Sequence, residues 1–133
     1  MKIFLLILLS LFASCATSNS PSGTLPAKRL AGRWHQGDGL GYNVSLSLNK
    51  DSTYDAEFWG CVGSGGTARG NWCLQNDKVL LSPIEEKDLM VNNLRSLDVV
   101  NAKKGVVLVQ SGQRRQFDAF PSESSLGCFT RSN

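Results

Sequence analysis

Beyond an apolar run near its start, the chain is dominated by short segments in which apolar and polar residues alternate. Every second residue is apolar in residues 42–48, which places on one face Tyr42, Val44, Leu46 and Leu48. Residues 53–61 repeat this alternation after a turn at Asp51-Ser52. The two segments therefore predict a β-hairpin with one buried side and one solvent-facing side.

The alternation in residues 53–61 also assigns side chains to the two faces of the sheet. Tyr54, Ala56 and Phe58 share the face that we expect in the core. Trp59 and Cys61 fall on the other face and are expected to point outward.

Further strand-like segments follow between turn residues, over residues 68–75, 78–83, 95–102, 105–110 and 115–120. Many short strands at this spacing predict an all-β domain, an antiparallel up-and-down meander that forms a small barrel or sandwich. One interruption stands out, because residues 82–85 fit a capping box with Pro83 at the first helical position. This motif favours a short helix over residues 83–91, although its apolar residues are poorly spaced for an amphipathic stripe.

A Gly-x-Trp pattern occurs twice, at residues 32–34 and 70–72, and each copy opens a predicted strand. We expect each tryptophan to close one end of the core, while its glycine lets another part of the chain come close. The alternative is a cavity for a small apolar ligand, lined by Trp34, Tyr54, Phe58 and Trp72. The first copy, placed before an up-and-down meander, resembles the entry of lipocalin-like barrels and of short bacterial lipoproteins built on similar sheets.

The apolar run of residues 3–12 has the length of a secretory h-region and is far short of the roughly 20 residues that cross a bilayer as a helix. Together with Lys2, Ala13-Ser14 and Cys15, it resembles the lipobox of bacterial lipoproteins, in which the cysteine receives a diacylglyceryl group and becomes the new N-terminus. The resemblance implies a signal peptide over residues 1–14 and a membrane anchor at Cys15 that carries acyl chains such as palmitate. Ordinary cleavage after Ala16 is the alternative, and it would give a secreted, non-lipidated binding or inhibitor protein.

Residues 15–29 are expected to form a flexible tether, because Ser, Thr, Pro and Gly dominate there without a periodic apolar pattern. About 12 such residues reach roughly 20 Å, enough to hold a domain clear of lipid headgroups. Ala16 is not the acidic residue that favours inner-membrane retention in the resembling family. The resemblance therefore favours the outer membrane, with a single β domain over residues 30–133 in the periplasm or at the cell surface.

The charge of the chain excludes one class of partner. The formal net charge of +3 falls to +2 when residues 1–14 are removed, because Lys2 is their only charged residue. That balance is too mild to indicate nucleic acid or an acidic polymer as a partner.

No arrangement of residues indicates an enzyme. His35 is the only histidine, and Asp38 three residues later could orient it as a general base, which leaves a small periplasmic enzyme as the alternative function. No nucleophile elbow or Cys-His signature accompanies it. Asp55 and Glu57 share one strand face, but carboxylate pairs on a solvated strand usually do no chemistry. We expect no catalytic residue, no cofactor and no metal, because one histidine and a few thiols fall short of a four-ligand zinc site.

Residues 62–70 are rich in glycine, and three of them formally match a dinucleotide-binding fingerprint. That fingerprint has to open a helix, whereas a strand pattern follows here, so no nucleotide is expected. We expect a mobile hairpin loop instead. The candidate contacts to a protein partner are this loop and the neighbouring outward aromatic residue, namely Trp59, Gly63, Ser64, Gly65, Gly66 and Arg69.

Three cysteines besides Cys15 remain after the leader, in a compartment that is oxidising if the chain is exported. Strand parity places Cys61 and Cys73 on the outward face, so we expect one disulfide, with Cys61–Cys73 as the first choice. A bridge that fastens the tail through Cys128 is the alternative.

These patterns favour a non-catalytic envelope lipoprotein. Its domain is expected to bind either a small apolar ligand inside the barrel or an envelope protein at its outer face and loops. An interior pocket larger than a few side chains would distinguish the first interpretation from the second.

Overall fold

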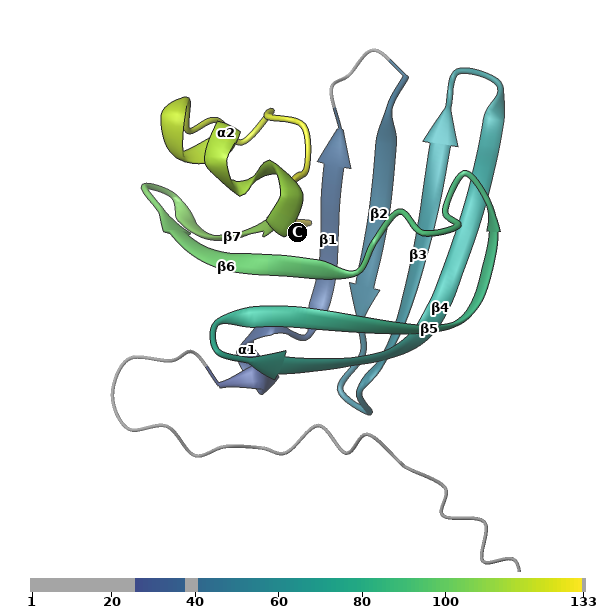
Figure 1. The fold of residues 1–133 in the computed structure, drawn as a ribbon, viewed down its shortest axis with the longest axis horizontal. Coiled ribbons are helices and arrows are strands. Elements are labelled where there is room, and N and C mark those ends of the chain that lie inside the picture. Colours follow the sequence, from purple (N-terminus) through teal and green to yellow (C-terminus); the bar gives the residue numbers. More distant parts are fainter. Residues whose placement is uncertain (1–25, 38–40, 133) are drawn as a thin grey trace, which may run out of the picture.

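The computed structural model describes residues 26–37 and 41–132. Eight antiparallel strands follow one another in a meander, and the last returns to pair with the first, so that the barrel is closed (Figure 1). The strands are β1 (Gly32–Gly37), β2 (Asn43–Leu48), β3 (Thr53–Gly60), β4 (Gly63–Gln75), β5 (Lys78–Asp88), β6 (Ser96–Ala102), β7 (Gly105–Gln110) and β8 (Cys128–Arg131). The predicted all-β up-and-down fold is confirmed, as a barrel.

Three short helical segments complete the described chain. The α1 helix (Ala27–Leu30) precedes β1, while the 3-10 turn η1 (Ser111–Gln113) and the α2 helix (Arg114–Ala119) connect β7 to β8. None of the helices in the described ranges is long and apolar enough to cross a membrane. The predicted signal peptide, Cys15 and most of the predicted tether lie outside the described residues, whereas α1 begins at Ala27, inside the segment expected to be tether.

The barrel interior is built by the period-two alternation seen in the sequence. Trp34 of β1 lies opposite Leu46, which lies opposite Ala56, which lies opposite Ala68, so that one ring of buried side chains runs through four strands. Two large side chains, Trp34 and Leu46, and two small ones, Ala56 and Ala68, form this ring and fill a narrow barrel. Fully burying a large apolar side chain contributes roughly 1.5–3 kcal/mol, so this interior supplies most of the driving force for folding.

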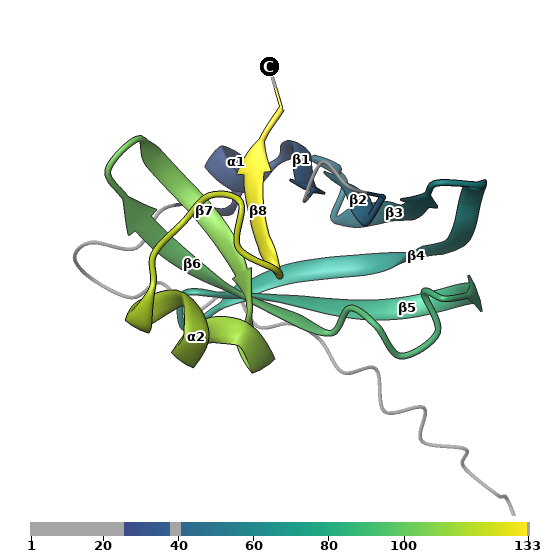
Figure 2. The same ribbon diagram turned by 90° about the horizontal axis from the view of Figure 1, so that it is seen from above.

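A second, smaller core lies outside the barrel wall. Phe117 of α2 packs against Val107, Val109 and Cys128, which point outward from β7 and β8. Figure 2 shows α2 on the outer side of β6 and β7. The strand predicted over residues 115–120 is therefore wrong, because this segment contributes a single apolar side chain to an outer surface instead of an alternating face to the interior.

Asp98 holds this outer layer in place. Its carboxylate accepts a hydrogen bond from the Ser111 hydroxyl at 2.9 Å and lies 3.0 Å from the Lys78 ammonium. The Arg114 guanidinium lies 3.7 Å away. Since Asp98 is only 7% exposed, these partners from β5, η1 and α2 are needed to offset the cost of burying its charge.

The glycine-rich stretch is the start of the long strand β4 and not the mobile loop that we predicted. A Cβ at Gly66 would lie 2.6 Å from the Lys87 carbonyl oxygen, and one at Gly70 would clash with the Ser82 carbonyl oxygen. The glycines therefore serve close packing of β5 on β4.

The helix predicted over residues 83–91 is also wrong, because β5 runs to Asp88. A β-bulge shifts the register between Arg69 and Gly70, so that Gly70 lies opposite Pro83 while Arg69 lies opposite Glu85. Proline is tolerated in a sheet at such a bulge, where a ladder hydrogen bond is already missing.

The barrel has two distinct ends (Figure 1). The lower end carries α1, the start of β1 and the turn between β2 and β3 at residues 49–52. The upper end carries the hairpin between β3 and β4, with Cys61 and Val62 at its tip. Because the strands run between these ends, groups at the two ends are separated by the length of the barrel.

Candidate functional site

The four residues proposed to line a ligand cavity all lie in the barrel core: Trp34, Tyr54, Phe58 and Trp72. The Trp34 indole N–H donates to the Leu30 carbonyl oxygen, and the Trp72 indole N–H donates to the Asn49 carbonyl oxygen, both at 2.9 Å. Both tryptophans therefore close the lower end, one against α1 and the other against the β2–β3 turn. The structure thus places both tryptophans at the same end of the core.

The glycine of the first Gly-x-Trp motif leaves room for the side chain of Arg131, which is about 100 residues away in the sequence. A Cβ at Gly32 would lie 2.6 Å from Nη1 of Arg131, and the Gly32 φ of 138° is one that glycine adopts readily. The Arg131 guanidinium stacks on the Trp34 ring at 4.6 Å. Arg131 thereby joins β8 to the first turn of the domain.

Two buried polar atoms face the interior without a hydrogen-bond partner among the described residues. They are Oε1 of Gln36 and the hydroxyl of Tyr54. Burial raises the pKa of the Tyr54 hydroxyl, and the nearby Glu86 carboxylate raises it further. Such atoms are usually satisfied by water or by a small polar ligand, so the interior is not uniformly apolar.

The upper end exposes apolar side chains on two separate connections. The β3–β4 hairpin presents Trp59, which is 46% exposed, and Val62 at its tip. The connection between β5 and β6 presents Leu89 and Val91. We call these four residues the upper rim. Sequence parity had placed only Trp59 here, and the signal for Leu89 and Val91 is the period-two run at residues 89–91, whose middle residue, Met90, is buried.

The β5–β6 connection is held firmly, although it is not a regular element. We call residues 89–95 the cap segment, and its Met90 and Leu94 insert into the barrel core. The Leu89 N–H donates to the Gly65 carbonyl oxygen at 3.0 Å, and a Cβ at Gly65 would meet the side chains of Phe58 and Leu89. Gly65 therefore makes room for the cap segment on β4.

An ion pair fastens the far end of the cap segment. Both guanidinium nitrogens of Arg95 contact the Glu86 carboxylate, at 2.5 and 2.9 Å, and the Asn92 amide oxygen accepts a further bond from Arg95 at 2.8 Å. The hydrogen bonds from Arg95 lower the pKa of Glu86 more than burial raises it. The bidentate pair ties the cap segment to β5.

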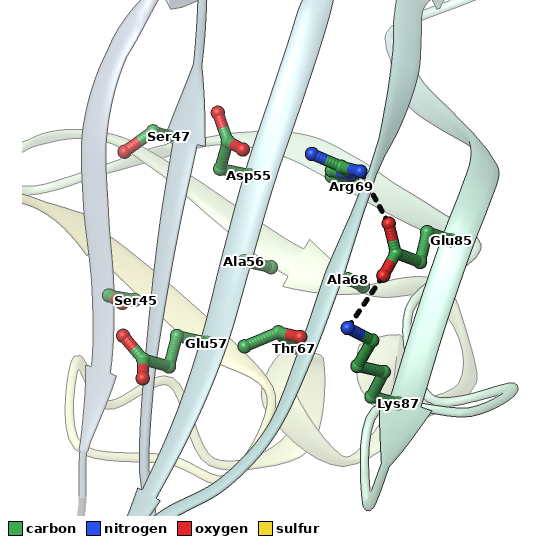
Figure 3. Close-up of a pocket in the computed structure, with 10 residues that line it drawn as sticks. All are labelled: Ser45, Ser47, Asp55, Ala56, Glu57, Thr67, Ala68, Arg69, Glu85 and Lys87. Atoms are coloured by element: carbon green, nitrogen blue, oxygen red, sulfur yellow. Dashed lines mark ion pairs between the residues drawn. The ribbon is translucent and has the colours of Figure 1, made fainter.

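A shallow polar groove of about 440 Å³ runs across the outside of the sheet (Figure 3). Ser45, Asp55, Glu57 and Thr67 lie on its floor and sides, and Arg69 borders it. The Glu85 carboxylate forms ion pairs with the Lys87 ammonium at 2.8 Å and with the Arg69 guanidinium at 2.5 Å. These two cations lower the pKa of Glu85. Arg69, a proposed partner contact, is thus engaged at mid-sheet and lies away from the upper rim.

The arrangement expected of an enzyme is not assembled by the described residues. His35 is exposed on the outer face of β1, and its proposed orienting partner, Asp38, lies outside the described residues. No cluster of three or more His, Cys, Asp or Glu side chains that could hold a metal ion occurs in residues 26–37 and 41–132.

No two of Cys61, Cys73 and Cys128 are joined, so the predicted disulfide among them is wrong. Cys61 lies at the hairpin tip, whereas Cys73 lies opposite Leu80 near the other end of β4. Ten residues of strand span about 33 Å, far beyond the roughly 7 Å that a disulfide allows between Cα atoms. Cys128 is buried under α2, and burial raises the pKa of its thiol to about 11.

Comparison of the chain with protein-family models, curated proteins and solved structures gives no significant match.

Proposed function

We propose that this chain is a non-catalytic, lipid-anchored protein of the bacterial cell envelope, and that its lipocalin-like barrel binds a protein partner through the upper rim. The observation that carries the proposal is the set of exposed apolar side chains on two firmly held connections at one end of the barrel. Trp59 has the character of an interface anchor, because a large, rigid aromatic side chain gains much buried area for little lost entropy.

A protein partner fits the barrel better than an apolar ligand carried inside it. The residues that would line an interior cavity pack against one another and against Met90 and Leu94 of the cap segment. The hollows described on this molecule between β2 and β5, beside α2 and beside α1 open on the outside of the barrel. A partner that offers an apolar pocket for Trp59, with room beside it for Val62 and Leu89, would bury all three at once.

The anchor part of the proposal is supported by the resemblance of the leader to a lipobox. Cys15→Ser should release the domain from membranes or leave an uncleaved precursor, because the acyl chains would then have no attachment site. Fractionation of envelopes followed by mass spectrometry of the N-terminal peptide measures this. The membranes are washed with concentrated salt first, so that only a lipid anchor retains the domain. A mutant that stays on the washed membranes at the mature size would refute the lipid anchor.

The partner-binding part is tested by site-specific photocrosslinking in the intact envelope. A photoreactive amino acid at Val62, which is fully exposed, should trap one protein partner, whereas the same group at Lys50 in the lower-end turn should not. Trp59→Ala should abolish the Val62 crosslink and weaken the affinity of the purified pair by at least about 30-fold, since an anchor residue typically contributes 2 kcal/mol or more.

Two outcomes would refute the proposal. The first is a crosslink at Val62 that survives Trp59→Ala, which would mean chance proximity. The second is crosslinking to lipid alone, which would make the upper rim a membrane-contacting surface. Co-purification of a small apolar molecule with the wild-type barrel, found by native mass spectrometry, would instead favour the carrier interpretation.

A further inference from the structure

A hollow of about 620 Å³ lies beside the lower end of the barrel, where α1, the start of β7 and the end of β8 meet. Its apolar lining comes from Leu30, Val106 and Val107, and its cationic lining comes from Arg29, Lys104 and Arg131. We call it the basic hollow. Its three cations belong to segments that are far apart in the chain and are brought together by closure of the barrel.

The three cations face a single carboxylate in this hollow. Glu123 also lines it, and its carboxylate lies 3.5 Å from the Lys104 ammonium. Lys104 is highly exposed, so this surface pair contributes little and can exchange for another anion. Three positive charges against one negative charge leave a formal charge of +2 in the hollow, equal to the +2 that the whole chain carries after residues 1–14 are removed.

Arg131 presents its charge from a fixed position. Its guanidinium donates to the Ala31 carbonyl oxygen at 3.0 Å and to the Arg29 carbonyl oxygen, and it stacks on Trp34. A guanidinium carries five N–H groups, so these two bonds leave donors for a further oxygen ligand. A planar donor held in this way matches the oxygens of a phosphate group.

We propose that the basic hollow docks the domain on the anionic phospholipid headgroups of a membrane surface. The cations supply the attraction to the phosphate of each headgroup. The position of the hollow agrees with this, because α1 is the first described element and follows directly on the segment expected to carry the anchor. This recognition belongs to the folded domain and goes beyond the proposed anchor and the upper rim, since it needs neither.

The test uses the chain from Ala16 onward, produced without an acyl group, and vesicles of two compositions. It should sediment with vesicles of phosphatidylcholine and phosphatidylglycerol but not with phosphatidylcholine alone, and added salt should reverse the binding. Arg29→Ala and Lys104→Ala should each weaken the partition coefficient about 5-fold, and the double variant about 25-fold. Both side chains are exposed, and circular dichroism would verify that the variants are folded.

The matched control is Arg115→Ala on α2, which removes one exposed cation outside the hollow and should leave binding unchanged. Equal binding to both vesicle types, or an equal loss with Arg115→Ala, would overturn the proposal. Displacement from vesicles by millimolar glycerol phosphate would also overturn it, because the ligand would then be a soluble phosphate. Trp59→Ala should not affect vesicle binding, so this result and the crosslinking result at Val62 can fail independently.

Discussion

The two ends of the barrel use the same kind of residue in opposite ways. At the lower end, Trp34 and Trp72 point inward, and each bonds a backbone carbonyl through its indole N–H. At the upper end, Trp59 points outward beside Val62 and is 46% exposed, whereas Trp72 is 6% exposed. Strand parity alone separates these roles, because Trp59 occupies an odd position on a strand whose even positions are buried.

An exposed apolar side chain indicates a binding surface most clearly when similar side chains elsewhere in the same molecule are buried and hydrogen-bonded. The lower end is closed by α1, by two indole hydrogen bonds and by the Arg131 guanidinium. Its tryptophans therefore stabilise the fold and offer little surface to a partner. The upper rim is also held in place, through the Glu86–Arg95 pair and the glycine contacts of β4, yet its four apolar side chains remain exposed. Rigid, exposed apolar area of this kind is typical of a recognition surface.

The contrast between the two ends is tested most directly by replacing one tryptophan at each end with alanine. Trp72→Ala should lower the free energy of unfolding by about 3–5 kcal/mol, because it leaves a large cavity and an unpaired carbonyl at Asn49. Trp59→Ala should change it by less than about 0.5 kcal/mol. Urea titrations of the two variants measure both values, and equal midpoints would mean that the facing assignment is wrong.

A second variant tests whether the lower end depends on the last strand. Arg131→Ala should cost about 1–2 kcal/mol, since it removes two charge-assisted hydrogen bonds and a cation–π contact at a partly solvated site. Arg33→Ala, an exposed cation on the neighbouring β1, serves as the control and should be near neutral. If both variants melted at the wild-type temperature, Arg131 would not be a structural link.

Acid should loosen the upper end before the lower end. Arg95 holds the pKa of Glu86 below its usual 4.5, so the stabilisation from this pair is complete above about pH 4.5 and is lost as the pH falls through the lower folded pKa. Amides of the cap segment should therefore exchange faster at low pH, after correction for intrinsic rates, while those of β1 stay protected.

The matched variant for this effect is Glu86→Gln, which keeps the shape of the side chain and removes its titration. It should show fast exchange in the cap segment at both pH values, because the ion pair with Arg95 is absent throughout. Persistence of the pH effect in Glu86→Gln would assign the titration to another group.

The smallest effect is expected in the interior between the two ends. Tyr54→Phe removes a buried hydroxyl that has no partner among the described residues, so the free energy of unfolding should stay within about 0.5 kcal/mol of wild type or rise by up to about 1 kcal/mol. Thermal melts near neutral pH suffice to measure this. A loss of more than about 1 kcal/mol would show that the hydroxyl is hydrogen-bonded in solution, for instance to an internal water.

Much of the barrel could be predicted from local patterns. The period-two runs of β2 and β3 placed Tyr54, Ala56 and Phe58 inside and Trp59 outside, because a strand with one buried face has few alternatives. The prediction failed where local signals compete with tertiary packing. Pro83 reads as a helix start in isolation, but it lies at a β-bulge whose register is set by contacts with Gly70 on another strand.

The candidate surfaces were harder to predict, for two different reasons. Leu89 and Val91 were hidden inside the predicted helix, although their alternation with Met90 was present in the sequence. The basic hollow has no local signal, because Arg29, Lys104 and Arg131 meet only when β8 closes the barrel. The disulfide prediction failed for a related reason, since the distance from Cys61 to Cys73 depends on whether the glycine-rich stretch is loop or strand.

The position of β8 also bears on how the molecule is made. Trp34 of the first strand pairs with Arg131 of the eighth, so closure of the barrel has to await synthesis of β8. Until then every nascent length is an open sheet with unpaired edges on β1 and β7, and contacts this distant in sequence form slowly. A premature stop codon before Cys128 would accordingly produce an aggregating open sheet and not a smaller barrel.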